Sequence, residues 1–180
     1  HRDLHKAIRR HRQMCIRDRF DPGIFSIGDT LCTGKQHVQF AGIPTFAPEH
    51  FARVTQVDTM KRKQFVKGME QIAQEGAIQI FTEPGGGLER VYVGVVGELQ
   101  FDVLESRMKS EYGVTYRQYP QPYQYIRRIS NGADPAKLHL FDVKWVQDFR
   151  GNNFLLFKTE WQVSHTLEDN AGLELVEFGH

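Results

Sequence analysis

Apolar and polar residues follow two different periods between residues 51 and 119. The stretch 51–58 has the composition of a strand, and the apolar positions after it recur at i, i+4, i+7 and i+8, as on one face of a helix. These helical positions are Phe65, Met69, Ile72 and Ala73. Asp58 or Thr59 can cap the helix at its start, and Gly76 can end it. The pattern therefore predicts a strand followed by a helix that ends at Gly76.

The alternation of strand and helix patterns continues up to residue 119. Residues 77–83 and 88–96 are predicted strands joined by a turn at 84–87, and residues 114–119 form another strand. A helix is predicted over 97–113, because four of its residues share one face: Phe101, Leu104, Met108 and Tyr112. The order β-α-β-β-α-β is that of the split β-α-β or ferredoxin-like plan. We therefore expect an α+β domain of this kind.

The C-terminal segment predicts further strands and one short helix. A strand over 123–130 follows Pro120–Pro122, and strands over 142–149 and 154–161 flank a four-residue connection typical of a hairpin. Thr159 and Gln162 have the spacing of a capping box, which predicts a helix from about residue 160 to 170. A last strand covers 173–178. We expect this segment to be a β-hairpin and helix extension of the ferredoxin-like domain.

The first 42 residues differ in character from the rest. Residues 1–19 hold seven Lys/Arg against two Asp, so they are either a basic arm that can reach nucleic acid or a segment outside the fold and of non-native origin. The lack of a sustained apolar period favours the second interpretation. Residues 20–42 predict short strands and turns, the end of a small β structure whose earlier strands are missing. A Pro-punctuated linker follows over 43–51.

Composition narrows the class of protein. The chain has 180 residues, a net charge of +1 and 40% hydrophobic residues, which is enough for a packed core. Its two cysteines, Cys15 and Cys32, form no C-x-x-C pair, and this fits a reducing compartment. The longest strongly apolar run, Val91–Gly97, is too short to span a bilayer, and no signal-peptide pattern is present. These features predict a cytoplasmic protein.

Motifs of nucleotide hydrolysis are incomplete. The stretch "GDTLCTGKQ" (28–36) resembles a phosphate-binding loop, but it has one residue too many between its glycines, and Gln36 stands where a Ser or Thr must hold magnesium. Asp169–Gly172 matches the short D-x-x-G motif, yet the end of a helix explains it better. The eight histidines form no metal-binding pair. We therefore predict no catalytic, cofactor-binding or metal-binding residue in this chain, and we expect it not to be an enzyme.

A binding function is the alternative to catalysis. The β-α-β-β-α-β order is shared with RNA-recognition motifs, whose central strands carry base-stacking aromatic residues. The strand over 88–96 offers only Tyr92, so stacking on the sheet is not expected. Basic residues at the start of the first helix are candidate contacts to RNA phosphates, or else a solvated helix face. They are Lys61, Arg62, Lys63 and Lys67.

Several stretches resemble a known family. The stretch "GIFSIGDTLCTGK" resembles the end of the second, β-barrel domain of translational GTPases. The stretches "GIPTFAPEHFARV", "MKRKQFVKGMEQIAQEGAIQIF" and "VGVVGELQFDVLESRMKSEYGV" resemble the third domain of the bacterial peptide chain release factor 3 family. Elongation factor G, with a similar "GELH" helix start, is an alternative, but "FAPEHF" and "EGAIQIF" favour the release factor family.

The resemblance implies a domain organisation and a function. Residues 20–42 would be the end of the barrel domain, and 43–180 a C-terminal third domain. Factors of this family use GTP to promote dissociation of class I release factors from the ribosome during translation termination. GTP and magnesium would bind in an upstream GTPase domain. The partners implied are the small-subunit side of the ribosome, class I release factors and that GTPase domain, with no membrane. A stand-alone RNA-binding module of ferredoxin-like fold is the alternative.

Overall fold

The computed structural model describes residues 46–87 and 90–179. The chain divides into two units, residues 1–42 and residues 43–180, and all described residues belong to the second. The predictions for the basic arm over 1–19 and for the barrel segment over 20–42 lie outside the described residues.

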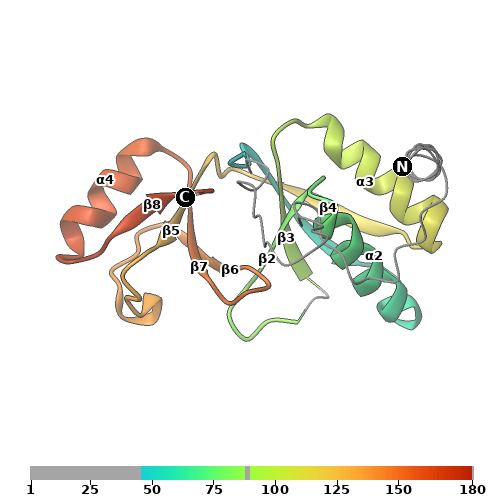
Figure 1. The fold of residues 1–180 in the computed structure, drawn as a ribbon, viewed down its shortest axis with the longest axis horizontal. Coiled ribbons are helices and arrows are strands. Elements are labelled where there is room, and N and C mark those ends of the chain that lie inside the picture. Colours follow the sequence, from blue (N-terminus) through green and yellow to red (C-terminus); the bar gives the residue numbers. More distant parts are fainter. Residues whose placement is uncertain (1–45, 88–89, 180) are drawn as a thin grey trace, which may run out of the picture. The chain divides into compact units, whose positions relative to one another are not determined.

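The first part of the described unit has the order of elements that the hydrophobic pattern predicted (Figure 1). Its strands pair in the order β4-β1-β3-β2, and every neighbouring pair is antiparallel. Gly85, with φ of 69°, lies in the hairpin turn between β2 and β3, as expected for the glycine cluster. The elements are β1 (His50–Gln56), a 3-10 turn (Thr59–Lys61), α2 (Arg62–Gln74), β2 (Gln79–Thr82), β3 (Arg90–Val95), α3 (Leu99–Tyr112) and β4 (Tyr116–Gln121).

Local signals set the ends of the two helices. The Asp58 carboxylate accepts a hydrogen bond from the Met60 backbone N–H at 2.9 Å, so Asp58 rather than Thr59 is the cap, and it caps the 3-10 turn that leads into α2. Gly76 follows α2 with φ of 76°, and Gly113 ends α3 with φ of 63°. Glycine adopts this left-handed conformation at little cost, which explains both helix stops.

The main core lies between the sheet and the two helices. Alternate strand residues, among them Val54 and Val93, face α2 and α3 and are completely buried. The helix positions predicted from the apolar period form the other side of this core, with Ala73 and Tyr112 packed at its margin. The fully buried or nearly buried helix residues are Phe65, Met69, Ile72, Phe101, Leu104 and Met108. The predicted core faces of both helices are confirmed.

The C-terminal segment forms four more strands and a third helix. Thr159 and Gln162 make the predicted capping box at the start of the helix, and Gly172, with φ of 86°, follows its end. The helix-stop interpretation of Asp169–Gly172 is therefore confirmed. The elements are β5 (Tyr125–Ile129), a 3-10 turn (Pro135–Lys137), β6 (Lys144–Gln147), β7 (Asn153–Phe157), α4 (Glu160–Asp169) and β8 (Leu175–Glu177).

This segment continues the first sheet, which the sequence did not predict. The eight strands form one antiparallel sheet in the order β4-β1-β3-β2-β6-β7-β5-β8, and the junction is the pairing of Thr82 with Gln147. Figure 1 shows α2 and α3 together at one end and α4 at the other. The sequence also placed Pro120 in a connection, whereas it lies within β4. A proline fits there because β4 is an edge strand with an unpaired side.

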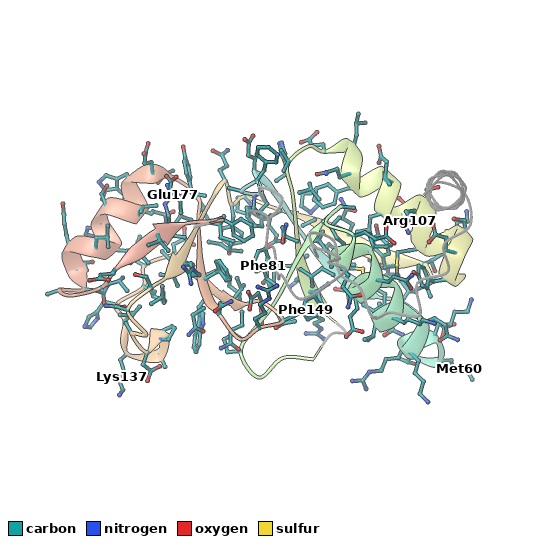
Figure 2. All side chains as sticks on the ribbon, in the orientation of Figure 1. Met60, Phe81, Arg107, Lys137, Phe149 and Glu177 are labelled. Carbon is teal, nitrogen blue, oxygen red and sulfur yellow. The ribbon has the colours of Figure 1, made fainter. Side chains whose placement is uncertain are left out.

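A second core joins the two parts of the sheet on the face without α2 and α3. Phe81, labelled near the centre of Figure 2, packs at 5.4 Å from the ring of Phe154 and 6.2 Å from that of Phe178. Phe51 and Tyr92 belong to the same cluster. This aromatic cluster makes residues 50–179 one packed unit rather than a domain with a loose extension.

Candidate nucleic-acid interface

The four basic residues predicted as RNA contacts lie on the exposed side at the start of α2. Lys61, Arg62, Lys63 and Lys67 are all exposed, and Lys63 and Lys67 lie on the face of α2 opposite the buried Phe65. Lys63 and Lys67 are four residues apart and so lie on one side of the helix. Met60, at the edge of Figure 2, belongs to the preceding turn and is 90% exposed. The structure therefore brings the predicted residues together on an accessible surface.

Lys61 also has a structural contact. Its ammonium donates a hydrogen bond to the backbone carbonyl of Gly113 at 2.6 Å, which satisfies a carbonyl at the end of α3. The contact ties the start of α2 to the end of α3. Within the predicted set, Lys61 therefore has a contact that links the two helices.

Two further contacts hold α2 against α3: the ion pair of Arg107 and the close approach of the helices at Gly68. The guanidinium of Arg107, labelled in Figure 2, binds the carboxylate of Glu75, which follows α2 directly, and that of Glu111 in its own helix α3. The hydrogen bonds that Arg107 donates, first to Glu111 and then to Glu75, raise the pKa of Arg107. The helices approach so closely at Gly68 that a Cβ atom there would lie 2.7 Å from the Met108 sulfur. The helix pair is therefore closely packed.

The opposite face of the sheet carries a second group of basic residues. Thr55 of β1 pairs with Arg90 of β3 and with Arg117 of β4, which places these three side chains in one row across three strands. The next row along β1 is Tyr119, Arg53 and Tyr92. The guanidinium carbon of Arg53 lies 5.3 Å from the centroid of the Tyr119 ring. All three arginines are exposed.

An acidic residue at the border of this face is already paired. Glu83 accepts a hydrogen bond from the Tyr92 hydroxyl at 3.0 Å and forms an ion pair with Lys144 at 2.6 Å. The hydrogen bond from Lys144 is the main reason why the pKa of Glu83 lies below its ordinary value. Burial, and then the bond to Glu83, raise the pKa of Tyr92. Glu83 therefore pairs directly with Lys144, and the charge of Arg53 acts on it as the smallest of these causes.

A small groove connects the two basic surfaces. It has a volume of about 300 Å³ and is lined by Arg62 at the start of α2 and by Arg90 at the start of β3. The remaining lining residues are Thr55, Gln56 and Thr59. The basic start of α2 and the arginine row of the sheet are therefore neighbours around one edge.

Sequence reasoning missed the sheet arginines because it searched the strands for aromatic residues. The alternation of residues along a strand, with a period of two, gave a usable signal for these arginines. Arg53 stands between Ala52 and Val54, both buried, so a charged residue must point to the face opposite the core. The same alternation does not reveal that Arg90 and Arg117 align with one another, since that depends on strand register.

Metal binding and membrane insertion find no support in the described part of the chain. No group of three or more His, Cys, Asp or Glu residues within 46–87 and 90–179 is arranged to hold a metal ion. No helix in these ranges combines the length and apolar character needed to cross a bilayer.

The model of one protein family, described as "Class II release factor RF3, C-terminal domain", matches residues 40–167. The chain belongs to this family. The RF3 C-terminal domain described here is similar to peptide chain release factor 3 of Symbiobacterium thermophilum, with 48% identity over 155 residues, covering 86% of this chain and 29% of that protein. The protein of the same name from Gloeothece citriformis is 40% identical over 157 residues, with the same coverage of both chains.

These matches confirm the resemblance to the release factor 3 family and connect the chain with translation termination. The chain spans about 29% of the length of the two relatives, so their other parts have no counterpart in it. The matched range includes the RF3 helix pair α2 and α3 and both basic surfaces. Both surfaces therefore belong to the family domain itself.

Proposed function

We propose that this domain is the ribosome-interacting part of a release factor 3 that uses GTP, as a whole factor, to promote dissociation of class I release factors from the ribosome. The family match over residues 40–167 carries this proposal. GTP and magnesium would bind in an upstream GTPase domain, and this chain would perform no hydrolysis itself. Its partners would be the small-subunit side of the ribosome, class I release factors and the GTPase domain, all in the cytoplasm.

We further propose an assignment of domains. Elements β1 to β4 with α2 and α3 have the element order and the 4-1-3-2 strand order that support a ferredoxin-like plan. Residues 43–180 would be the third domain of the factor, and residues 20–42 the end of its barrel domain. Residues 1–19 would not belong to the native fold.

The first described residues are anchored on β3, which would suit transmission of movement from an upstream domain. Pro48 is buried against Gly94, where a Cβ atom would lie 2.8 Å from the Pro48 ring, and the Glu49 backbone N–H donates to the Val95 carbonyl at 2.9 Å. A displacement of the chain before residue 46 would therefore pull directly on β3. Since the helices are locked to each other, the unit would move as a rigid body.

The proposal can be tested with a chimeric factor. Residues 43–180 of this chain would replace the matching part of the Symbiobacterium thermophilum protein, and ribosome-stimulated GTP hydrolysis and release of a class I factor would be measured. We expect both activities to be retained. A chimera that folds and binds ribosomes but shows neither activity would overturn the proposal. A stand-alone RNA-binding module would give that negative result while still binding RNA.

A matched pair of variants tests the transmission step in the chimera. Gly94→Ala would push against Pro48 and loosen the anchored linker, at a cost of about 1 to 3 kcal/mol. Gly97→Ala is the control, because no atom lies within 4 Å of the added carbon. We expect Gly94→Ala to reduce the stimulated hydrolysis while ribosome binding persists, and Gly97→Ala to leave both unchanged.

A further inference from the structure

The helix-free face of the first four strands is divided between a covered end and an exposed end. At the covered end, Phe51, Phe81 and Tyr92 pack against the C-terminal strands in the second core. At the exposed end stand Arg53 and Arg90 together with other residues of the two rows described above. One part of this face is therefore covered by packing, and a basic part remains exposed.

The charge of the exposed end is predominantly positive. Arg53, Arg90 and Arg117 come from three adjacent strands, and strands are spaced about 4.8 Å apart, so the outer two lie roughly 10 Å from each other. Glu83, the acidic neighbour, is bonded to Lys144. The groove then extends the positive charge to Arg62 on α2. Three guanidinium groups in fixed register form a surface that suits a repeating anion.

An aromatic ring lies beside these charges. Tyr119 is 40% exposed on the edge strand β4, and the guanidinium of Arg53 packs over its ring. Tyr92, by contrast, is only 5% exposed and its hydroxyl is bonded to Glu83, so it is not accessible to a base. An exposed ring next to arginines is the combination that binds single-stranded nucleic acid, with bases stacked on the ring and phosphates held by the guanidinium groups.

We propose that this exposed end, together with the start of α2, is one RNA-binding surface. Arg53, Arg90 and Arg117 contact phosphates, and Tyr119 stacks an unpaired base. An acidic protein could also bind the arginines. Binding of such a protein would not explain why an exposed tyrosine lies in the same row. The inference deepens the proposed function, on which it rests only for the identity of the RNA as ribosomal.

The test compares two triple variants of the whole chain. The first replaces the sheet arginines: Arg53→Gln, Arg90→Gln and Arg117→Gln. The control removes three positive charges from exposed residues elsewhere: Lys109→Gln, Lys137→Gln and Arg150→Gln. Both variants keep residues 1–19, so any contribution of that segment is the same in both. Thermal melting checks that each variant is folded.

Binding is measured by fluorescence anisotropy with a labelled single-stranded RNA of about 12 nucleotides, long enough to cover one such surface. The sheet variant should reduce the magnitude of the negative slope of log K against log salt by about 2. Each of the three lost phosphate contacts removes roughly 0.7 from it. The control should leave the slope close to that of the parent chain. Equal losses in both variants, or no RNA binding by the parent chain, would overturn the proposal.

Tyr119→Leu tests the stacking role separately. It should weaken RNA binding about 5- to 100-fold without changing the salt slope, because stacking on an aromatic ring carries no charge. Polyglutamate serves as the protein-like competitor. If it displaced the RNA at equal charge concentration and Tyr119→Leu had no effect, the surface would be a site for acidic protein and the proposal would be wrong.

The outcome is independent of the chimera experiment. RNA binding that depends on the sheet arginines would stand even if the chimera were inactive, and only the proposed function would then be lost. An active chimera combined with RNA binding that ignores the arginines would remove this inference alone.

Discussion

Tyr116 has a buried hydroxyl that is a weak point of the main core. Its ring packs under α3 at the margin of the core, and among the described residues its hydroxyl oxygen is buried without a hydrogen-bond partner. Burial, followed by the nearby charges of Glu105 and Asp102, raises the pKa of Tyr116. We predict that Tyr116→Phe stabilises the fold, since it removes a polar group that loses water on folding and gains nothing in return.

The expected magnitude follows from the cost of an unsatisfied hydroxyl. Such a group costs about 1 to 3 kcal/mol, and part of the gain on its removal is lost to the small void left by the oxygen, so a net gain of about 1 kcal/mol is expected. Tyr92→Phe is the matched control. It deletes a hydroxyl that donates to Glu83 at 3.0 Å, and because the Glu83 side chain is 48% exposed, a loss of about 1 kcal/mol is expected.

The two variants are compared by urea unfolding and by thermal melting under identical conditions. Tyr116→Phe should raise the melting temperature by about 2 to 4 °C, and Tyr92→Phe should lower it by a similar amount. The urea m-value should not change in either variant, because neither substitution alters the surface exposed on unfolding. If Tyr116→Phe destabilised the chain as much as Tyr92→Phe, the hydroxyl would have a partner and the reasoning would be refuted.

Two further predictions concern the helix contact at Gly68 and the acidic residue Glu83 at the border of the sheet. Gly68→Ala should lower the free energy of unfolding by about 1 to 2 kcal/mol, because overpacking against Met108 and Tyr112 outweighs the better helix propensity of alanine, whereas Gly97→Ala should be nearly neutral in the same urea titration. Glu83→Gln should flatten the acid side of the stability curve. The pKa of Glu83 is lowered from 4.5, so its contribution is complete above pH 4.5 and is lost as the pH falls through the native pKa; an unchanged acid slope would contradict this.

Much of the local structure was predictable because it depends on neighbours in the chain. The apolar period placed Phe65 and Leu104 in the core, and the capping box at Thr159 marked the start of α4. These signals work because a helix repeats every 3.6 residues and leaves its first backbone N–H groups without partners. Lys63 and Lys67 of the predicted set were likewise exposed for a local reason, since they lie on the face of α2 opposite Phe65.

The candidate surface was only half predictable. Lys63 and Lys67 are adjacent on one helix face, so spacing alone brought them together. Arg53 and Arg117 are far apart in sequence and become neighbours only because β1 and β4 pair in one particular register. A shift of one residue would turn an arginine toward the core, so burial of Val54 and Ala52 is what selects the register.

The sequence by itself determined the helices, their ends, the faces that pack inward and membership of the release factor family. Tertiary structure decided that all eight strands form one sheet, that aromatic residues distant in sequence build a second core around Phe81, and that the arginines align. The physical reason is the range of the interactions. Helix caps and apolar periods act over a few residues, whereas strand order and register depend on how distant segments bury their apolar surface together.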